Sequence, residues 1–384
     1  QINYAGWLSS EGGDAPGVTL LGAILLTDVN GSEQLNFSSG SDLYVSVSDI
    51  DRNTDSGTLE SVTVTVESET ESVGESVTLA ETGVSTGIFT GSISFSEDSV
   101  VEGDGILQVV RGDKLTGSYT DPADDYGNES TVTDVAYYDV TLVSDTLSSD
   151  ATWALSNSPF LVTGDVTVPD DVTLTIEPGV EVRFMPGSDD QSSGSNPYSS
   201  ELRVMGSLVA IGTESDSITF VSNSEDPTDN DWDGLDLQSP DVVHLSYVSL
   251  RHTYDVFRDG LNFDGSTDSL HIVHSSFWAS GAMFNNDHWS SVGSGARVVI
   301  EDNRFIGFGR IFSDRVNLYD ANADGTLLKI NRNTFVDLSD GIMSSYGGRF
   351  QIYDVGVRVL FTNNQSDSGS KLQFTYVLDD DEIS

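Results

Sequence analysis

Residues 298–305, VVIEDNRF, recur thirty residues later as LKINRNTF (328–335), with apolar, amide and aromatic residues at matching places. Two earlier segments, VVHLSYVSL (242–250) and LHIVHSSF (270–277), follow the same pattern. A period near 30 residues suits a coil of three short strands and three turns, and stacking such coils places like residues above like. The repeat therefore predicts a solenoid of β-strands from about residue 151 onward.

The register of the repeat predicts three columns of residues. The first column is apolar and comprises Leu245, Ile272, Ile300, Ile330 and Leu360. The second comprises Leu250, Phe277, Phe305 and Phe335, and the third Asn303, Asn333 and Asn363. We expect the apolar columns to fill the interior and the Asn column to bond its neighbours at a sharp turn. The last copy is degraded, with Arg358 and Gln365 where apolar residues are expected.

Three further segments extend the repeat toward the N-terminus: VTGDVTVPDDVTLTIEPGVEVRF (162–184), SSELRVMGSLVAIGTESDSITFVS (199–222) and DWDGLDL (231–237). With them, residues 152–370 resemble the right-handed parallel β-helix (pectin-lyase-like) of secreted prokaryotic proteins. The resemblance implies a domain over 147–384 with about seven coils and a C-terminal cap. It implies little about function, because such solenoids host polysaccharide lyases, glycosidases, adhesins and structural stalks.

The first part of the chain shows alternating apolar and polar residues in about seven short runs, such as SVTVTVES (61–68) and VAYYDVTLV (135–143). This spacing predicts an immunoglobulin-like β-sandwich over 1–146, so the whole chain is expected to be all-β. Residues 77–95 and 103–128 resemble a sandwich module of large secreted or surface-anchored prokaryotic proteins, which implies an extracellular address. The apolar segment 17–29 is expected either to be the first strand of this sandwich or to be donated to a neighbouring subunit.

The charge of the chain is extreme, because 62 acidic residues against 16 Lys and Arg give a net charge of −46. Such a surface disfavours nucleic acid and anionic membranes as partners. It repels itself unless cations screen or bind it, which favours a salty or calcium-rich medium outside the cell. Cysteine is absent, which excludes disulfides and thiolate sites, and no apolar run is long enough for a membrane span.

Acidic loops are the clearest candidates for calcium binding. Carboxylate and amide oxygens at alternate positions are the spacing of a calcium loop. Three loops supply them: Asp49, Asp51, Asn53, Asp55 and Glu60; Asp229, Asp231 and Asp233; and Asp320, Asn322 and Asp324. The first loop has Thr54 where a turn-making Gly is usual, and the other two lack an acid at position twelve. Asp and Asn are also ordinary turn residues, so both interpretations stay open.

All five histidines lie between residues 244 and 288, and the repeat places His244 and His271 in one outward column. They are expected to stack there as ordinary surface residues or to contribute to a metal site. If the protein is a polysaccharide lyase or glycosidase, this face supplies the catalytic candidates, which are Asp255, Asp259, Asp264, His252 and His274. Tyr198, Trp232, Trp278 and Trp289 are expected either to stack on sugars or to lie in the core.

Four sequons permit glycosylation, at Asn30, Asn36, Asn128 and Asn364. Taken together, the sequence predicts an extracellular, calcium-stabilised structural subunit that self-assembles into a filament, tube or surface layer, because the ends of a β-helix present unpaired strand edges. The alternatives are a β-helix carbohydrate enzyme and an adhesin that binds glycans or another cell.

Overall fold

The structure is a computed structural model. It describes residues 21–123, 128–194, 196–258, 262–263, 268–285, 290–293, 295–312, 316–318, 326–337, 350–352, 358–362, 364–366 and 376–378. These residues form 36 strands and two single turns of 3-10 helix, η1 (Ile50–Arg52) and η2 (Leu155–Asn157), so the all-β prediction is confirmed. The chain divides into two compact units, residues 1–140 and 141–384.

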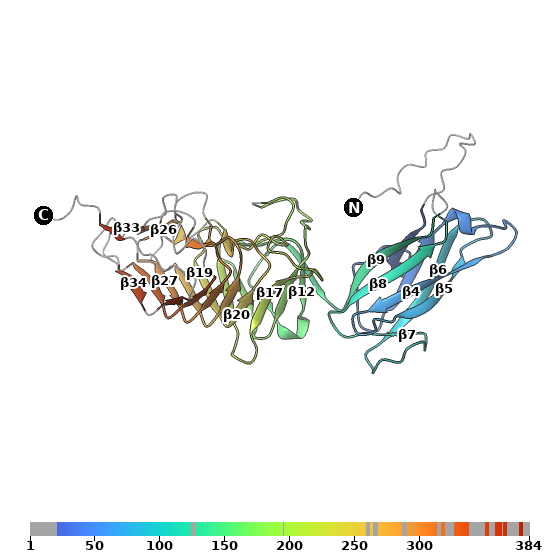
Figure 1. Ribbon diagram of the computed structural model, residues 1–384, viewed down its shortest axis with the longest axis horizontal. Helices are drawn as coiled ribbons and strands as arrows, with labels where there is room; N and C mark the ends of the chain where they lie inside the picture. The colour runs from blue at the N-terminus through green and yellow to red at the C-terminus, as the bar shows by residue number, and fades with distance from the viewer. Residues whose placement is uncertain are drawn as a thin grey trace, which may run out of the picture. The chain divides into compact units, whose positions relative to one another are not determined.

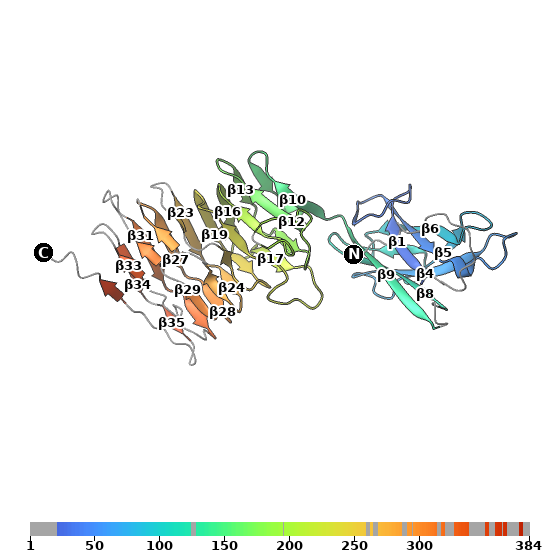
Figure 2. The same ribbon diagram turned by 90° about the horizontal axis from the view of Figure 1, so that it is seen from above.

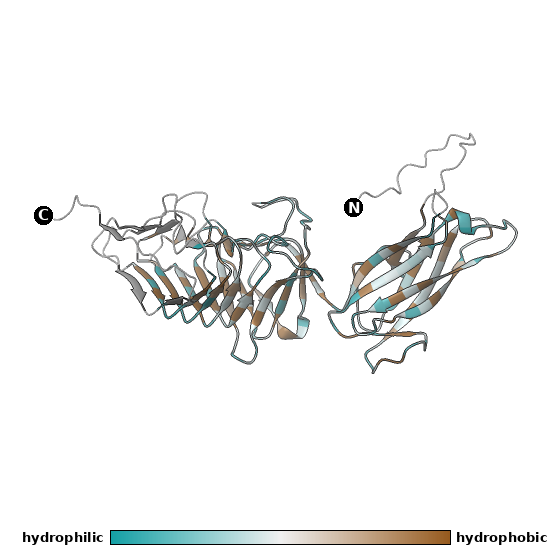
Figure 3. Ribbon diagram, in the orientation of Figure 1, coloured by the Kyte–Doolittle hydropathy of each residue, from teal (hydrophilic) through white to brown (hydrophobic). Residues whose placement is uncertain are grey.

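The first unit is one curled, mostly antiparallel sheet (Figure 1). Its strands follow the order β1-β3-β6-β5-β4-β8-β9-β2, and β7 pairs with β6. Their bounds are β1 (Ala23–Thr27), β2 (Asn36–Phe37), β3 (Asp42–Ser48), β4 (Ser61–Ser68), β5 (Glu75–Glu81), β6 (Ile88–Ser96), β7 (Ile106–Gln108), β8 (Lys114–Asp121) and β9 (Ser130–Tyr138). Alternate residues of these strands are buried in one apolar core, which appears as bands of brown along the ribbons in Figure 3.

Strand β1 lies within the apolar segment 17–29 and pairs antiparallel with β3 of its own unit. It also packs against β8, where Gly117 leaves room for it, because a Cβ on Gly117 would lie 2.7 Å from a methyl of Leu26. Residues 23–27 are therefore the first strand of this unit and are not donated to a neighbour; residues 17–20 lie outside the described residues.

The second unit is a stack of coils whose strands pair in parallel with the coils before and after (Figure 2). An eight-stranded sheet, wall A, contributes one strand to each coil: β11 (Ala151–Trp153), β13 (Thr173–Ile176), β16 (Ser207–Ile211), β19 (Val242–Ser246), β23 (Ser269–Val273), β27 (Arg297–Glu301), β31 (Leu327–Asn331) and β34 (Arg358–Thr362). Parallel strands that return to the same sheet once per coil define a parallel β-helix.

A fourteen-stranded sheet supplies two further walls, because β12 (Phe160–Val168) pairs along its first half with β14 and along its second half with β15. Wall B runs through β14 (Glu181–Phe184), β17 (Ile218–Ser222), β20 (Val248–Leu250), β24 (Ser276–Trp278), β28 (Arg304–Ile306), β32 (Thr334–Val336) and β35 (Gln365–Ser366). Wall C runs through β15 (Leu202–Val204), β18 (Leu235–Leu237), β21 (Phe257–Arg258), β25 (Ala282–Phe284) and β29 (Arg310–Phe312).

A smaller five-stranded sheet lies beside these walls and comprises β22 (Asn262–Phe263), β26 (Ser290–Val292), β30 (Val316–Leu318), β33 (Phe350–Ile352) and β36 (Tyr376–Leu378). Strand β10 (Thr141–Thr146) pairs in parallel with β12. The division between the units therefore falls at residues 140 and 141, six residues before the expected boundary, since 141–146 belong to the stack.

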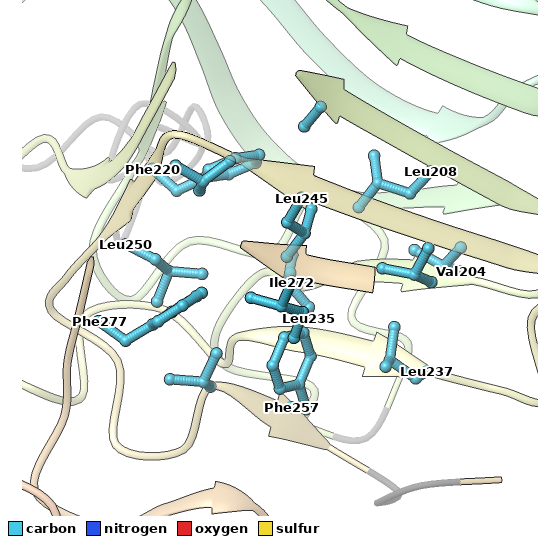
Figure 4. Packing of buried hydrophobic residues seen from close by; sticks show 14 of the residues in the cluster. Val204, Leu208, Phe220, Leu235, Leu237, Leu245, Leu250, Phe257, Ile272 and Phe277 are labelled. Carbon is cyan, nitrogen blue, oxygen red and sulfur yellow. The ribbon is translucent and has the colours of Figure 1, made fainter. Parts of the chain in front are cut away.

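The predicted columns are found in the interior of the stack (Figure 4). Leu245, Ile272, Ile300 and Ile330 lie in register, and so do Leu250, Phe277, Phe305 and Phe335. The rings of Phe277, Phe305 and Phe335 stack with centroids 5.4 and 5.2 Å apart, close to the separation of neighbouring strands. Like residues therefore stack on one another from coil to coil in the interior.

The prediction for the last coil is wrong by one residue. Ile330 pairs with Phe361 instead of Leu360, because this coil is one residue longer than the thirty-residue step. With the same shift, Leu328 pairs with Val359, so apolar residues of β31 still pair with apolar residues of β34. The apolar pairing is lost in β35, where Ser366 pairs with Phe335.

The Asn column bonds its neighbours as expected, but its third member is Asn364, and Asn363 lies outside the described residues. Asn333 is fully buried, and its Oδ1 accepts hydrogen bonds from both the backbone N–H and Nδ2 of Asn303. Its own N–H and Nδ2 donate in turn to Asn364 Oδ1. Since each Asn follows a residue with positive φ (Asp302 and Arg332), the ladder holds the sharp turn between walls A and B.

Candidate functional site

The 49–60 loop uses its acidic groups to hold its own backbone. Asp49 is 2% exposed, and its two oxygens accept hydrogen bonds from the Asp51 N–H and the Tyr119 hydroxyl. Glu60 Oε1 accepts from the N–H groups of Thr54 and Asp55. Asn53 Oδ1 and Glu60 Oε2 are buried and accept no hydrogen bond, so protein donors bond only part of the predicted set of oxygens.

In the 229–234 loop the carboxylates serve different partners. Trp232 is buried and stacks on Phe184 with centroids 3.9 Å apart, which fixes the loop. Asp231 accepts from the hydroxyls of Ser222 and Thr228, whereas Asp233 forms an ion pair with Arg258 at 3.1 Å.

Across the part of the chain that the structure describes, no three or more His, Asp or Glu side chains are arranged to hold a metal ion. The third predicted loop, with Asp320, Asn322 and Asp324, lies outside the described residues.

His244 and His271 share an outward column of wall A, as the repeat predicts. Their rings stack with centroids 4.7 Å apart. Burial lowers the pKa of His244, and the neighbouring His271 lowers it further, so this imidazole is neutral near pH 7. The stacked rings of His244 and His271 form a ladder on the outer surface of wall A.

Of the catalytic candidates, the structure describes Asp255, His252 and His274. Asp255 is buried, and its oxygens accept from the Ala282 N–H and Asn285 Nδ2, both at 2.6 Å. Burial raises the pKa of Asp255. Its partners make Asp255 an anchor between neighbouring coils of wall C.

The two histidine candidates lie at turns of the coil. His252 Nδ1 accepts a hydrogen bond from the Ser222 N–H, and His274 stacks on Tyr247. Asp259 and Asp264 lie outside the described residues.

Of the aromatic candidates, Trp278 lies half-exposed on wall B, where the Arg251 guanidinium stacks 4.1 Å above its ring. Trp232 belongs to the core, Tyr198 is 78% exposed, and Trp289 lies outside the described residues. Trp278 is therefore the indole that a partner can contact on wall B.

Sequence reasoning missed a buried pair of carboxyl groups in the first unit, Glu71 and Glu75, which are 1% and 2% exposed. Glu75 accepts the N–H groups of Gly103, Asp104 and Gly105. Glu71 Oε2 accepts the Gln108 N–H, whereas Oε1 accepts no N–H or O–H.

Burial raises the pKa of Glu71, and contact with the Glu75 carboxylate raises it further, so a proton shared with Glu75 fits the geometry. The sequence signal was available, because Glu75 falls in phase with the buried residues Val77 and Leu79 of β5.

The sequons differ in what their side chains do. Asn30 and Asn128 are exposed. The side-chain nitrogen that a glycan would occupy donates to Val140 O in Asn36 and to Ile330 O in Asn364, both at 3.0 Å. A glycan would replace one hydrogen of this amide nitrogen and would have to fit beside the bonded carbonyl.

No model of a known protein family matches the chain. No curated protein matches it either. Within the described residues, no helix has the length and apolar character needed to cross a membrane.

Proposed function

We propose that the protein is an extracellular structural subunit that assembles with copies of itself into a filament, tube or surface layer. The observation that carries this proposal is the way the coils pair. Each sheet of the second unit is built by adding parallel strands one coil at a time, and among the described residues the last strands added are β29, β34, β35 and β36. A terminal strand offers backbone N–H and C=O groups to another strand, so the stacking that builds the coil also suits its extension by a second copy.

Calcium enters this proposal as a counterion between copies. Protein donors bond both oxygens of Asp49 and both oxygens of Asp231, whereas Asn53 Oδ1 and Glu60 Oε2 of the 49–60 loop are buried and accept no hydrogen bond. The chain as a whole has a net charge of −46. Two surfaces of this charge repel each other unless cations lie between them. Divalent cations with oxygen ligands suit that role, and their abundance outside cells agrees with the proposed location.

Electron microscopy and sedimentation of the purified protein test this proposal. We expect extended or layered assemblies in millimolar calcium and their loss on chelation. The control is sodium chloride at the same ionic strength, which separates binding of calcium from screening. If the protein remains a single subunit at every calcium and protein concentration, the assembly proposal is wrong. If assembly persists after chelation, the protein assembles but calcium is not required.

A further inference from the structure

The outward residues of walls A and B contrast with the rest of the chain; we call this surface the front. Roughly one residue in six of the chain is acidic. From β16 of wall A and β17 of wall B onward, four outward columns contain no Asp or Glu: Ser207, Val242, Ser269, Arg297 and Leu327; Val209, His244, His271, Val299 and Lys329; Thr219, Ser249, Ser276, Arg304 and Thr334; and Val221, Arg251, Trp278, Ile306 and Val336. The described strands of the two walls carry two outward carboxylates, Glu181 on β14 and Glu301 on β27, and Glu181 forms an ion pair with Arg183 at 2.9 Å. None of these side chains is buried.

Strand propensity alone does not explain the front. Asp and Glu are depleted in strands in general. In the first unit, however, the outward positions of β4 and β5 are filled mostly by Ser and Thr, such as Thr63 and Thr78, together with Glu67 and Ala80. On the front, many equivalent positions carry Val, His, Trp or Arg. Half-exposed apolar and aromatic side chains with Arg nearby are typical of binding surfaces.

The front is also neutral to basic. Arg297 and Arg304 are exposed on β27 and β28. The nearest acidic residues are already paired, Glu301 with Lys329 at 2.7 Å and Asp302 with Arg332 at 2.6 Å. These pairs leave no net negative charge at the edge between the two walls.

We propose that the front binds an acidic surface of a second copy of this chain, side by side. The inference rests on the proposed self-assembly and adds to it the surface that makes the lateral contact. Charge complementarity identifies the occupant, because a second copy carries a net charge of −46, whereas the two carboxylates on the front strands, Glu181 and Glu301, are paired with Arg183 and Lys329. A lateral contact through the front leaves the terminal strands of the stack free to extend it lengthwise.

Two double variants test the front, one on each wall. V209E/R297E changes wall A, and V221E/R304E changes wall B. The two variants are matched in geometry. In each, the second changed residue lies three strands further along the wall than the first and two residues before the position in register with it. The matched control V84E/R52E makes the same change of −3 in charge at exposed residues of the first unit.

We expect each front variant to raise the protein concentration needed for assembly about tenfold or more, because like charges placed across an interface are costly. The control is expected to assemble within about twofold of the wild type, since its added charge lies away from the front. Circular dichroism and thermal unfolding show whether each variant is folded. If the variant on one wall does not fold, the variant on the other wall still tests the front.

The outcomes separate the two proposals. A wild-type protein that never assembles overturns both. A wild-type protein that assembles, together with front variants that assemble at the same concentration, overturns the front alone and leaves the proposed function standing. The third arm measures wild-type binding to polygalacturonate beads. If that binding is lost in the front variants while their assembly is unchanged, the front belongs to an acidic polysaccharide and not to a second copy.

Discussion

At the scale of single residues, buried polar groups decide how the chain turns. Glu71, Glu75 and Asn333 are each almost fully buried, and the backbone groups that they bond lie at turns or between coils. A buried polar group is tolerated only when its partners are supplied, so each of these side chains fixes the local conformation.

Glu71 predicts a dependence of stability on pH. Its pKa in the folded state is raised, so its stabilising contribution is complete below the ordinary Glu pKa and is lost as the pH rises through the raised value. Glu71→Gln keeps the shape, donates to Glu75 and does not titrate. We expect the melting temperature of E71Q to exceed that of the wild type by a margin that grows from about pH 4 to about pH 8.

The comparison variant is Glu75→Gln, which weakens the acceptor of three backbone N–H groups. We expect E75Q to be less stable than the wild type at neutral pH. If the difference in melting temperature between E71Q and the wild type is the same at every pH, Glu71 and Glu75 do not share a proton.

At the scale of elements, the stack is held by register. Parallel strands align Phe277 with Phe305 and Asn303 with Asn333, so an error in one coil affects its neighbours. The repeat predicted this register for four coils, in which the step varies from 27 to 30 residues, because each strand repeats the same apolar pattern. The prediction failed in the last coil, where the step is 31 residues.

Asn333→Ala tests the ladder. The change removes the acceptor of the buried Asn303 N–H and the side-chain donor to the Ile300 carbonyl. We expect a loss of about 2 to 4 kcal/mol in the free energy of unfolding, measured by urea denaturation. The control Asn331→Ala removes a bond to Glu301, whose side chain is 13% exposed and pairs with Lys329. The ladder has no special role if both variants lose the same amount.

At the scale of the whole molecule, the net charge is expected to make stability depend on salt. A net charge of −46 opposes compaction, and salt shortens the range of that repulsion from about 10 Å at 0.1 M to about 3 Å at 1 M. We therefore expect the melting temperature to rise steadily with sodium chloride. Calcium chloride is expected to give a larger rise at equal ionic strength, and magnesium chloride a smaller one, if oxygen ligands hold calcium. Scanning calorimetry checks both, and equal curves for all three salts would exclude specific calcium binding.

The candidate sites were harder to predict than the fold. Spacing in the sequence placed the carboxylates of Asp49 and Asp231 in calcium-like loops, but spacing does not say which donors compete for them. In the folded chain Tyr119, 70 residues from Asp49, donates to its carboxylate. The partners of Glu71 and Glu75 are also distant in the sequence, because the backbone N–H groups that they accept belong to residues 103–108.

The sequence by itself determined the all-β character, the parallel coils, the inward columns and the stacked histidines, because periodicity is a local property and burial follows it. Tertiary structure decided which polar groups meet, since hydrogen bonds and ion pairs depend on distances between residues far apart in the chain. It also decided the face on which the few carboxylates are paired with Arg or Lys. The columns of the front consist of residues about 27 to 35 positions apart, which become neighbours when the coils stack.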